Sequence, residues 1–139
     1  MAFRWLRSTT RTLPVRIPNI TAKASTTFTS GCAVVVDSTG VLDVAAAGAK
    51  VAGIYDGPTV TTGSADKLEF IEATPGDVFE VGYTGTPDSA FVVGQQTADI
   101  ASGALLLNAA DVTGGAFAIL SIDTTNTKAT VRAKLRQFS

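Results

Sequence analysis

Short apolar runs alternate with glycines and small polar residues from residue 24 to the end of the chain. The runs are rich in Val, Ile, Phe and Thr, the residue types that favour strands. No segment keeps a helical period over three turns, and one short turn within the Ala-rich stretch 41–51 is the most helix we expect. The pattern predicts nine strands, at Cys32–Asp37, Gly40–Val44, Val51–Tyr55, Leu68–Glu72, Val78–Tyr83, Phe91–Thr97, Leu105–Asn108, Phe117–Asp123 and Thr127–Leu135.

The alternation within these runs predicts which side chains form the core. Residues 129–135 carry apolar side chains at the odd positions and polar or charged ones at the even positions. This is the pattern of a strand with one buried face, which places Leu135 with the apolar side chains. The predicted core consists of Val34, Val36, Ile54, Phe70, Phe79, Val81, Ile119, Ile122 and Val131.

Three turns connect the predicted strands. Asp37-Ser38-Thr39-Gly40 has the residue preferences of a type I turn, and Thr74-Pro75-Gly76-Asp77 those of a type II turn. Asp123-Thr124-Thr125-Asn126 separates two apolar runs and predicts a closing hairpin. Many short strands at close spacing predict an all-β fold, a compact β-sandwich or barrel-like (β-tulip-like) domain of short strands.

Residues 1–23, here called the N-terminal segment, differ from the rest of the chain. They hold five basic residues, no acid and the only tryptophan, Trp5. Pro14 and Pro18 lack an amide donor and push the preceding residues toward extended geometry. Residues 3–13 could form a short helix or remain extended. We expect an extended basic N-terminal arm over residues 1–23, followed by a single β-rich domain over 24–139.

The net charge of −1 conceals an uneven distribution of charge. The N-terminal segment is purely basic, whereas residues 24–127 contain all twelve acids and only two bases, Lys50 and Lys67. The last four bases follow residue 127. An acidic body with two basic ends indicates that the ends contact something acidic, such as a neighbouring copy of the body.

The composition offers little for catalysis or for a cofactor. The chain has no histidine, which removes the usual general base, and no Gly-Lys-Ser/Thr phosphate loop. The single cysteine, Cys32, begins an apolar run and is expected to be a small buried hydrophobe. Asp37 and Asp43 could approach each other across a hairpin and bind calcium, but solvated turn acids are the favoured interpretation. We expect a protein that is not an enzyme, has no cofactor or metal, and has no membrane span, because no apolar run approaches ~18 residues.

Three interpretations of the N-terminal segment compete. A mitochondrial transit peptide would also be Arg-rich and free of acids, but the prolines break a helix after about a dozen residues. A nucleic-acid arm is disfavoured because the acidic body would repel a phosphate backbone. We prefer an anchoring arm that lies along a partner protein, since aromatic and arginine side chains are typical interface anchors. The predicted partner-binding residues are Phe3, Arg4, Trp5, Leu6, Arg7, Arg11, Arg16 and Ile17.

The stretch GCAVVVDSTGVLDVAAAGAKVAGIYDG (Gly31–Gly57) resembles the core of the capsid decoration, or cement, proteins of tailed bacteriophages. Residues 75–78 (PGDV), the Val93-Gly94 pair and a glycine-rich segment before the closing hairpin are similar to the later part of that family. The resemblance covers about residues 24–139. It implies a non-enzymatic virion protein, often trimeric, that binds the major capsid protein on the outer capsid surface. Together with the charge distribution it suggests oligomer contacts at Arg132, Lys134 and Arg136.

Two other functions remain open at this stage. A phage tail or head–tail joining protein would also be β-rich and would self-associate. A small carbohydrate-binding or lipocalin-like module is the third candidate. Against it stand the low aromatic content of 7% and the position of Trp5 on the tail rather than in a cleft.

Overall fold

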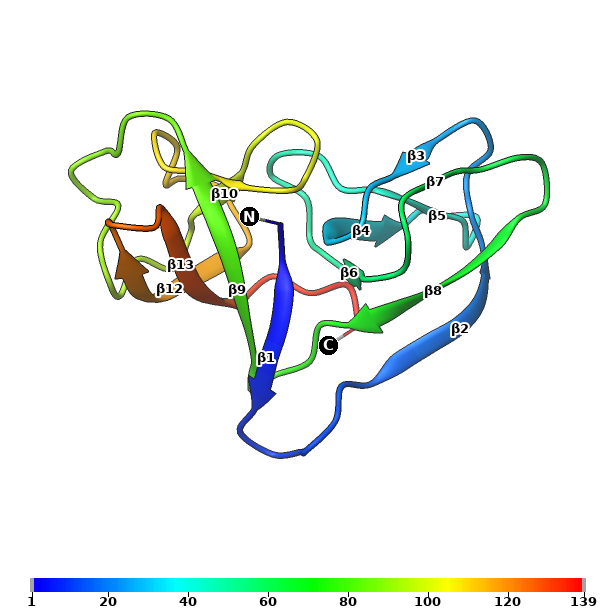
Figure 1. Ribbon diagram of the computed structural model, residues 1–139, viewed down its shortest axis with the longest axis horizontal. Helices are drawn as coiled ribbons and strands as arrows, with labels where there is room; N and C mark the ends of the chain where they lie inside the picture. Colours follow the sequence, from blue (N-terminus) through cyan, green and yellow to red (C-terminus); the bar gives the residue numbers. More distant parts are fainter. Residues whose placement is uncertain (1, 139) are drawn as a thin grey trace.

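The computed structural model describes residues 2–138, and Met1 and Ser139 lie outside the described part. Within residues 2–138 the chain forms strands and no helix, which confirms the predicted all-β class. Curled sheets pack into a compact sandwich or half-barrel (Figure 1). The strands are β1 (Arg4–Ser8), β2 (Arg16–Thr21), β3 (Thr27–Phe28), β4 (Cys32–Val36), β5 (Leu42–Val44), β6 (Gly53–Tyr55), β7 (Val60–Thr61), β8 (Lys67–Glu72), β9 (Asp77–Thr84), β10 (Asp99–Ile100), β11 (Leu107–Asn108), β12 (Phe117–Asp123) and β13 (Lys128–Ala133).

The first sheet is organised around β9, its longest strand. One edge of β9 pairs with β13, which continues into a hairpin with β12. The other edge is shared, because β1 pairs with Asp77–Glu80 and β11 pairs with Tyr83 and Thr84. Strand β10 completes the sheet beside β11.

The second sheet has the strand order β2-β8-β6-β4-β5, and all of its pairings are antiparallel. A small two-stranded sheet, β3 with β7, lies beside it. The turn from β8 to β9 carries the chain from the second sheet to the first (Figure 1).

The N-terminal segment follows this turn along both sheets. Strand β2 pairs with β8, β1 pairs with β9, and between them the Thr9 amide donates to the Gly76 carbonyl at 3.1 Å. The segment is extended, as predicted, but residues 4–21 are not an arm that leaves the domain. They supply an edge strand to each sheet, because β8 and β9 each have one edge whose amides and carbonyls need partners.

The C-terminal segment also connects the two sheets. After β13 in the first sheet, the side-chain amide of Gln137 forms hydrogen bonds of 2.7 and 2.8 Å with the backbone of Val36 in the second. The rings of Phe138 and Phe70 have centroids 6.4 Å apart. Both ends of the described chain therefore hold the sheets together.

One continuous core cluster runs through the molecule. Seven of the nine predicted core residues are buried, and the other two, Val36 and Ile122, are partly buried against the cluster. Leu135 was placed on the apolar face by alternation, but it is 41% exposed. The reason is that β13 ends at Ala133, so the strand period no longer applies at residue 135.

The predicted turns have the expected geometry. The Gly40 amide donates to the Asp37 carbonyl at 3.0 Å, and the Asp77 amide donates to the Thr74 carbonyl at 3.2 Å. Gly76 has a φ of +90°, which a type II turn requires at its third position. The closing hairpin is also confirmed, with Asp123 opposite Lys128.

One predicted strand is wrong and several short ones were not predicted. Residues 91–97 form a loop in which Phe91 is buried against Tyr83, with ring centroids 4.9 Å apart, while Val92 and Val93 are exposed. The sequence Phe91-Val92-Val93 looks like a strand, but Gly94 adopts a φ of +96°, which strands do not use. The strands not predicted were β1, β2, β3, β7 and β10, of which the last three have only two residues each.

Candidate interaction surface

Most of the positive charge of the N-terminal segment is paired within the chain. Three arginines bind carboxylates of the body: Arg4 with Glu80 at 2.7 Å, Arg11 with Asp77 at 2.8 Å, and Arg16 with Asp56 at 2.9 Å. Lys23 lies 3.3 Å from Asp43, and Arg16 is also 3.5 Å from Glu69. The basic end does contact an acidic body, as predicted from the charge distribution, but that body is its own.

Phe3 is part of the core and not an exposed anchor. It is 4% exposed, and its ring centroid lies 5.1 Å from that of Phe117 in β12. Its amide donates to the Gly31 carbonyl at 3.0 Å. A Cβ on Gly31 would lie 2.6 Å from the Cβ of Ala2, so the glycine is needed for this close approach. The prediction that Phe3 binds a partner is corrected, because its ring is already buried in its own domain.

The other apolar residues predicted as anchors are also engaged within the chain. Trp5 and Ile17 are partly buried against the core, and Ile17 lies opposite Phe70 in β8. Leu6 occupies a bulge in β1, between the paired residues Trp5 and Arg7, and is partly buried. Arg4, Arg7 and Arg16 remain exposed, whereas Arg11 is partly buried.

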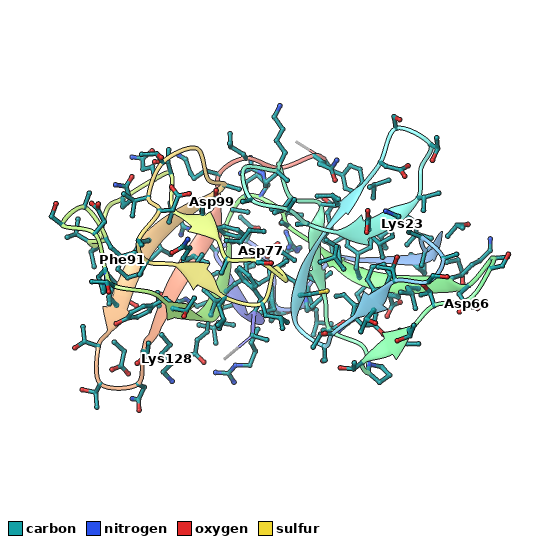
Figure 2. All side chains as sticks on the ribbon, turned by 90° about the horizontal axis from the view of Figure 1, so that it is seen from above. Lys23, Asp66, Asp77, Phe91, Asp99 and Lys128 are labelled. Atoms are coloured by element: carbon teal, nitrogen blue, oxygen red, sulfur yellow. The ribbon has the colours of Figure 1, made fainter. Side chains whose placement is uncertain are left out.

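Asp77 holds the N-terminal segment to the junction between the sheets. Its side chain is 0% exposed and lies near the middle of the molecule (Figure 2). One carboxylate oxygen accepts hydrogen bonds from Trp5 Nε1 at 3.0 Å and from the Arg11 guanidinium at 2.8 Å. The other accepts from the amide and the hydroxyl of Thr74, at 2.9 and 2.8 Å. This carboxylate therefore joins β1, the following loop and the β8–β9 turn.

We expect Asp77→Ala to destabilise the protein by about 3 kcal/mol, because the donors on Trp5, Arg11 and Thr74 lose an acceptor whose side chain is fully buried. The melting temperature, measured by circular dichroism, should fall clearly, and the emission of Trp5 should shift to the red. Asp66→Ala is the matched control, since Asp66 is exposed at the far end of the molecule (Figure 2). Equal melting temperatures for the two variants would contradict the role given to Asp77.

A basic face covers the outside of the first sheet. We use this name for Arg4 and Arg7 of β1 together with Lys128 and Arg132 of β13. Residues that pair directly across strands point to the same face. Arg4 and Thr130 both lie opposite Glu80, which places Arg4, Thr130 and the neighbouring alternate residues Lys128 and Arg132 on one side. Arg7, opposite Val78, lies on that side too.

The acids near the basic face do not neutralise it. Glu80 lies at its centre, 2.7 Å from Arg4 and 3.4 Å from Lys128, and these two cations hold the pKa of its carboxyl below the ordinary value. Asp123 lies opposite Lys128 in the hairpin. Four cations and two carboxylates leave a net charge of +2. Arg7 and Arg132 form no ion pair within residues 2–138.

The predicted oligomer contacts at the C-terminal end differ in their exposure. Lys134 is exposed, whereas Arg132 and Arg136 are partly buried. The Arg136 guanidinium donates to the Ala133 carbonyl at 2.7 Å, and the residue forms a bridge with Val51. In both arginines Nε is covered and has no partner within the described residues. Arg136 therefore helps to hold the C-terminal segment between the sheets, and Lys134 is the most exposed of the three residues.

A cleft with a volume of about 540 Å³ opens at the junction of the sheets, next to the basic face. Trp5 and Pro14 line it, together with the paired Arg16 and Asp56. Arg4 also lines it, so the cleft and the basic face adjoin. Sequence reasoning missed this cleft, because it is formed only when the N-terminal segment lies on the body. The sequence argument that Trp5 is remote from any cleft is therefore wrong.

The other candidate functional residues, Cys32, Asp37 and Asp43, are buried or form contacts within the chain. Cys32 is buried, as predicted, and burial raises the pKa of its thiol to about 11. Asp37 accepts hydrogen bonds from Thr39 and Val41 within its own turn, whereas Asp43 pairs with Lys23. Within residues 2–138 no group of three or more metal-ligating side chains comes together. The described part of the chain also contains no helix long and apolar enough to cross a membrane.

Comparisons of the chain with protein-family models, with curated proteins and with solved structures found no significant match. The resemblance to decoration proteins therefore stays a prediction from the sequence. What the structure adds is a set of surfaces, the basic face and the adjoining cleft, on an all-β body.

Proposed function

We propose that this chain is a structural protein of a tailed-phage virion, which binds the outer surface of the icosahedral capsid and stabilises it. The observation that carries the proposal is the basic face, a cationic surface on which Arg7 and Arg132 form no ion pair within residues 2–138. The chain as a whole has a net charge of −1. Such a face suits attachment to an acidic protein surface. The resemblance of Gly31–Gly57 to decoration proteins gives the proposal its partner, the major capsid protein.

The construction of the body supports a role in attachment. Both ends of the described chain pair with the sheets, so the basic face lies on paired strands and not on a loop. A surface held in this way loses little conformational entropy on binding. The mode of attachment differs from the arm predicted from sequence, because the anchors Phe3 and Ile17 are used inside the domain. The attachment residues that remain exposed in the N-terminal segment are Arg4, Arg7 and Arg16, of which Arg4 and Arg7 belong to the basic face.

We further propose that the protein acts as a homo-oligomer, most simply a trimer. Single exposed ion pairs contribute only about 0.2–1 kcal/mol, so an apolar contact must accompany Lys134. Exposed apolar side chains suitable for this contact are Val92, Val93, Leu135 and Phe138. Native mass spectrometry of protein released from capsids should show a trimer, and a monomer at every concentration would contradict this part of the proposal.

The central test is binding to undecorated capsids of the phage that encodes the chain. Purified protein should co-sediment with these capsids, saturate at a fixed ratio to the capsid protein, and appear on the outer surface in electron micrographs. Protein that forms rings or tubes alone and ignores capsids would instead favour the tail or head–tail joining function.

A carbohydrate-binding module is the second candidate, and one observation favours it. Trp5 lines a cleft next to the polar side chains of Arg16 and Asp56, and aromatic rings beside polar groups are suited to bind sugars. Its indole nitrogen is already bonded to Asp77, which leaves only the ring for contact. Changes in Trp5 emission on addition of oligosaccharides, with no binding to capsids, would support this candidate over the first.

A further inference from the structure

We infer that the basic face and the adjoining cleft form one docking site for an extended acidic segment of the partner protein, with an apolar side chain of that segment seated in the cleft. The inference rests on the proposed function, because it assigns the place on this chain where the capsid protein binds. The occupant is a peptide segment of the capsid protein, rich in Asp and Glu around one apolar residue.

The charge of the basic face selects an acidic occupant. Arg7 and Arg132 carry charges that no carboxylate within residues 2–138 neutralises. Val78 lies opposite Arg7, and Arg132 follows Val131, which lies opposite the next residue of β9, Phe79. Val78 is 1% exposed and does not belong to the core cluster. Arg7 is exposed, whereas Arg132 is partly buried with its Nε covered. Long basic side chains can cover apolar surface with their aliphatic stems while the charged group reaches water. Arginine forks of this kind bind carboxylates in a bidentate manner.

The cleft selects an apolar side chain next to those carboxylates. Its apolar lining includes Ile54 and Ile71 of the second sheet, with Trp5 and Pro14 beside them. Arg4 belongs to both the cleft and the basic face, and its side chain is 62% exposed. If the partner segment places an apolar residue in the cleft, the carboxylate that follows this residue can therefore reach Arg4. A later carboxylate of the same segment can reach Arg7. The few residues that dominate the binding energy of an interface are enriched in Trp and Arg and cluster in well-packed pockets.

The charge distribution of the whole molecule agrees with this placement. Among the described residues, Arg4, Arg11, Arg16 and Lys23 of the N-terminal segment form ion pairs, whereas Arg7 forms none and is exposed. Arg7 lies on β1, so its position is fixed by the pairing with β9. A cation held on a strand can select a partner with less entropic cost than a cation on a free tail.

The first experiment measures capsid binding by a charge-reversed pair. Arg7→Glu combined with Arg132→Glu should bind undecorated capsids at least about tenfold more weakly than the wild type, with a smaller difference in high salt. The matched control is Lys50→Glu combined with Lys67→Glu, which changes the net charge equally at two exposed positions. Lys50 lies between β5 and β6 and Lys67 begins β8, all strands of the second sheet, whereas the basic face lies on the first. The control should bind within about twofold of the wild type. Circular dichroism must show that both variants are folded.

The second experiment uses the only tryptophan as a reporter of the cleft. The capped peptide Asp-Glu-Leu-Asp-Glu should change the emission of Trp5 in a saturable way, whereas the neutral peptide Asn-Gln-Leu-Asn-Gln and the acidic peptide Asp-Glu-Gly-Asp-Glu should not. The charge-reversed pair should lose the response, and the control pair should keep it. This readout requires no capsid, so it separates the docking site from the capsid function.

The two failures can be distinguished. If the wild type and the charge-reversed pair bind capsids equally well, the docking site is wrong while the capsid function stands. If the acidic peptide changes Trp5 emission but the wild type ignores capsids, the site binds acidic segments and the capsid function is wrong. If neither peptide nor capsid binds, both are overturned.

Discussion

Removal of residues 1–18 should unfold the protein or leave it barely stable. This expectation reverses the one that follows from a free arm, whose deletion would weaken binding without affecting the fold. Phe3 is buried in the core, and Trp5 and Ile17 pack against it. Burying such side chains contributes about 1.5–3 kcal/mol when complete. Their joint loss is therefore on the order of 5 kcal/mol, comparable with the whole stability of many domains.

The deletion also exposes two strand edges. Residues Asp77–Glu80 of β9 lose β1, and Phe70 and Ile71 of β8 lose their partners in the first half of β2. Unpaired edges of this kind template pairing with other chains, so the truncated protein should aggregate as well as lose stability. Size-exclusion chromatography and thermal melting would report both effects.

Leu13→Ala is the control for this deletion. Leu13 belongs to the same segment but is 72% exposed in the loop between β1 and β2, so its truncation should leave the melting temperature unchanged. A truncated protein that remains monomeric and melts within a few degrees of the full chain would show that β1 and the first half of β2 contribute little to the fold.

The second large effect is expected for Val81→Asp. Val81 is 0% exposed in β9, where it lies opposite Ala129 of β13, at the centre of the first sheet. An aspartate there would lose the apolar burial and place an unpaired carboxylate in the core, at a cost of more than about 4 kcal/mol. The variant should be unfolded at room temperature by far-UV circular dichroism.

Arg7→Ala provides the contrast, because Arg7 is exposed and forms no ion pair within the described residues. Its melting temperature should stay close to that of the wild type. A folded Val81→Asp protein with a native-like melting curve would contradict the assignment of Val81 to the core.

The local pattern of the sequence was sufficient for much of the body. Alternation identified β12 with its bounds, and turn residues identified the two turns and the closing hairpin. These features depend on neighbouring residues, since side-chain period and glycine conformation act over a few positions. The same reasoning failed where a tertiary contact determines the backbone conformation. Residues 91–97 form an apolar run but fold as a loop, in which Phe91 packs against Tyr83.

The sequence alone established an all-β chain with a basic, extended N-terminal segment and an acidic body, and it identified the residues whose charges must find partners. Only the tertiary structure decided that most of those partners lie in the same chain. Arg4 and Glu80 are 76 positions apart, and no local pattern can report a pairing over that distance. Strand pairing uses the backbone amide and carbonyl groups, which nearly every residue has. The strand with which a segment pairs therefore depends on which edges of the folded sheets are unpaired. The burial of Phe3, the basic face and the cleft beside Trp5 all follow from the pairing of the N-terminal segment with β8 and β9.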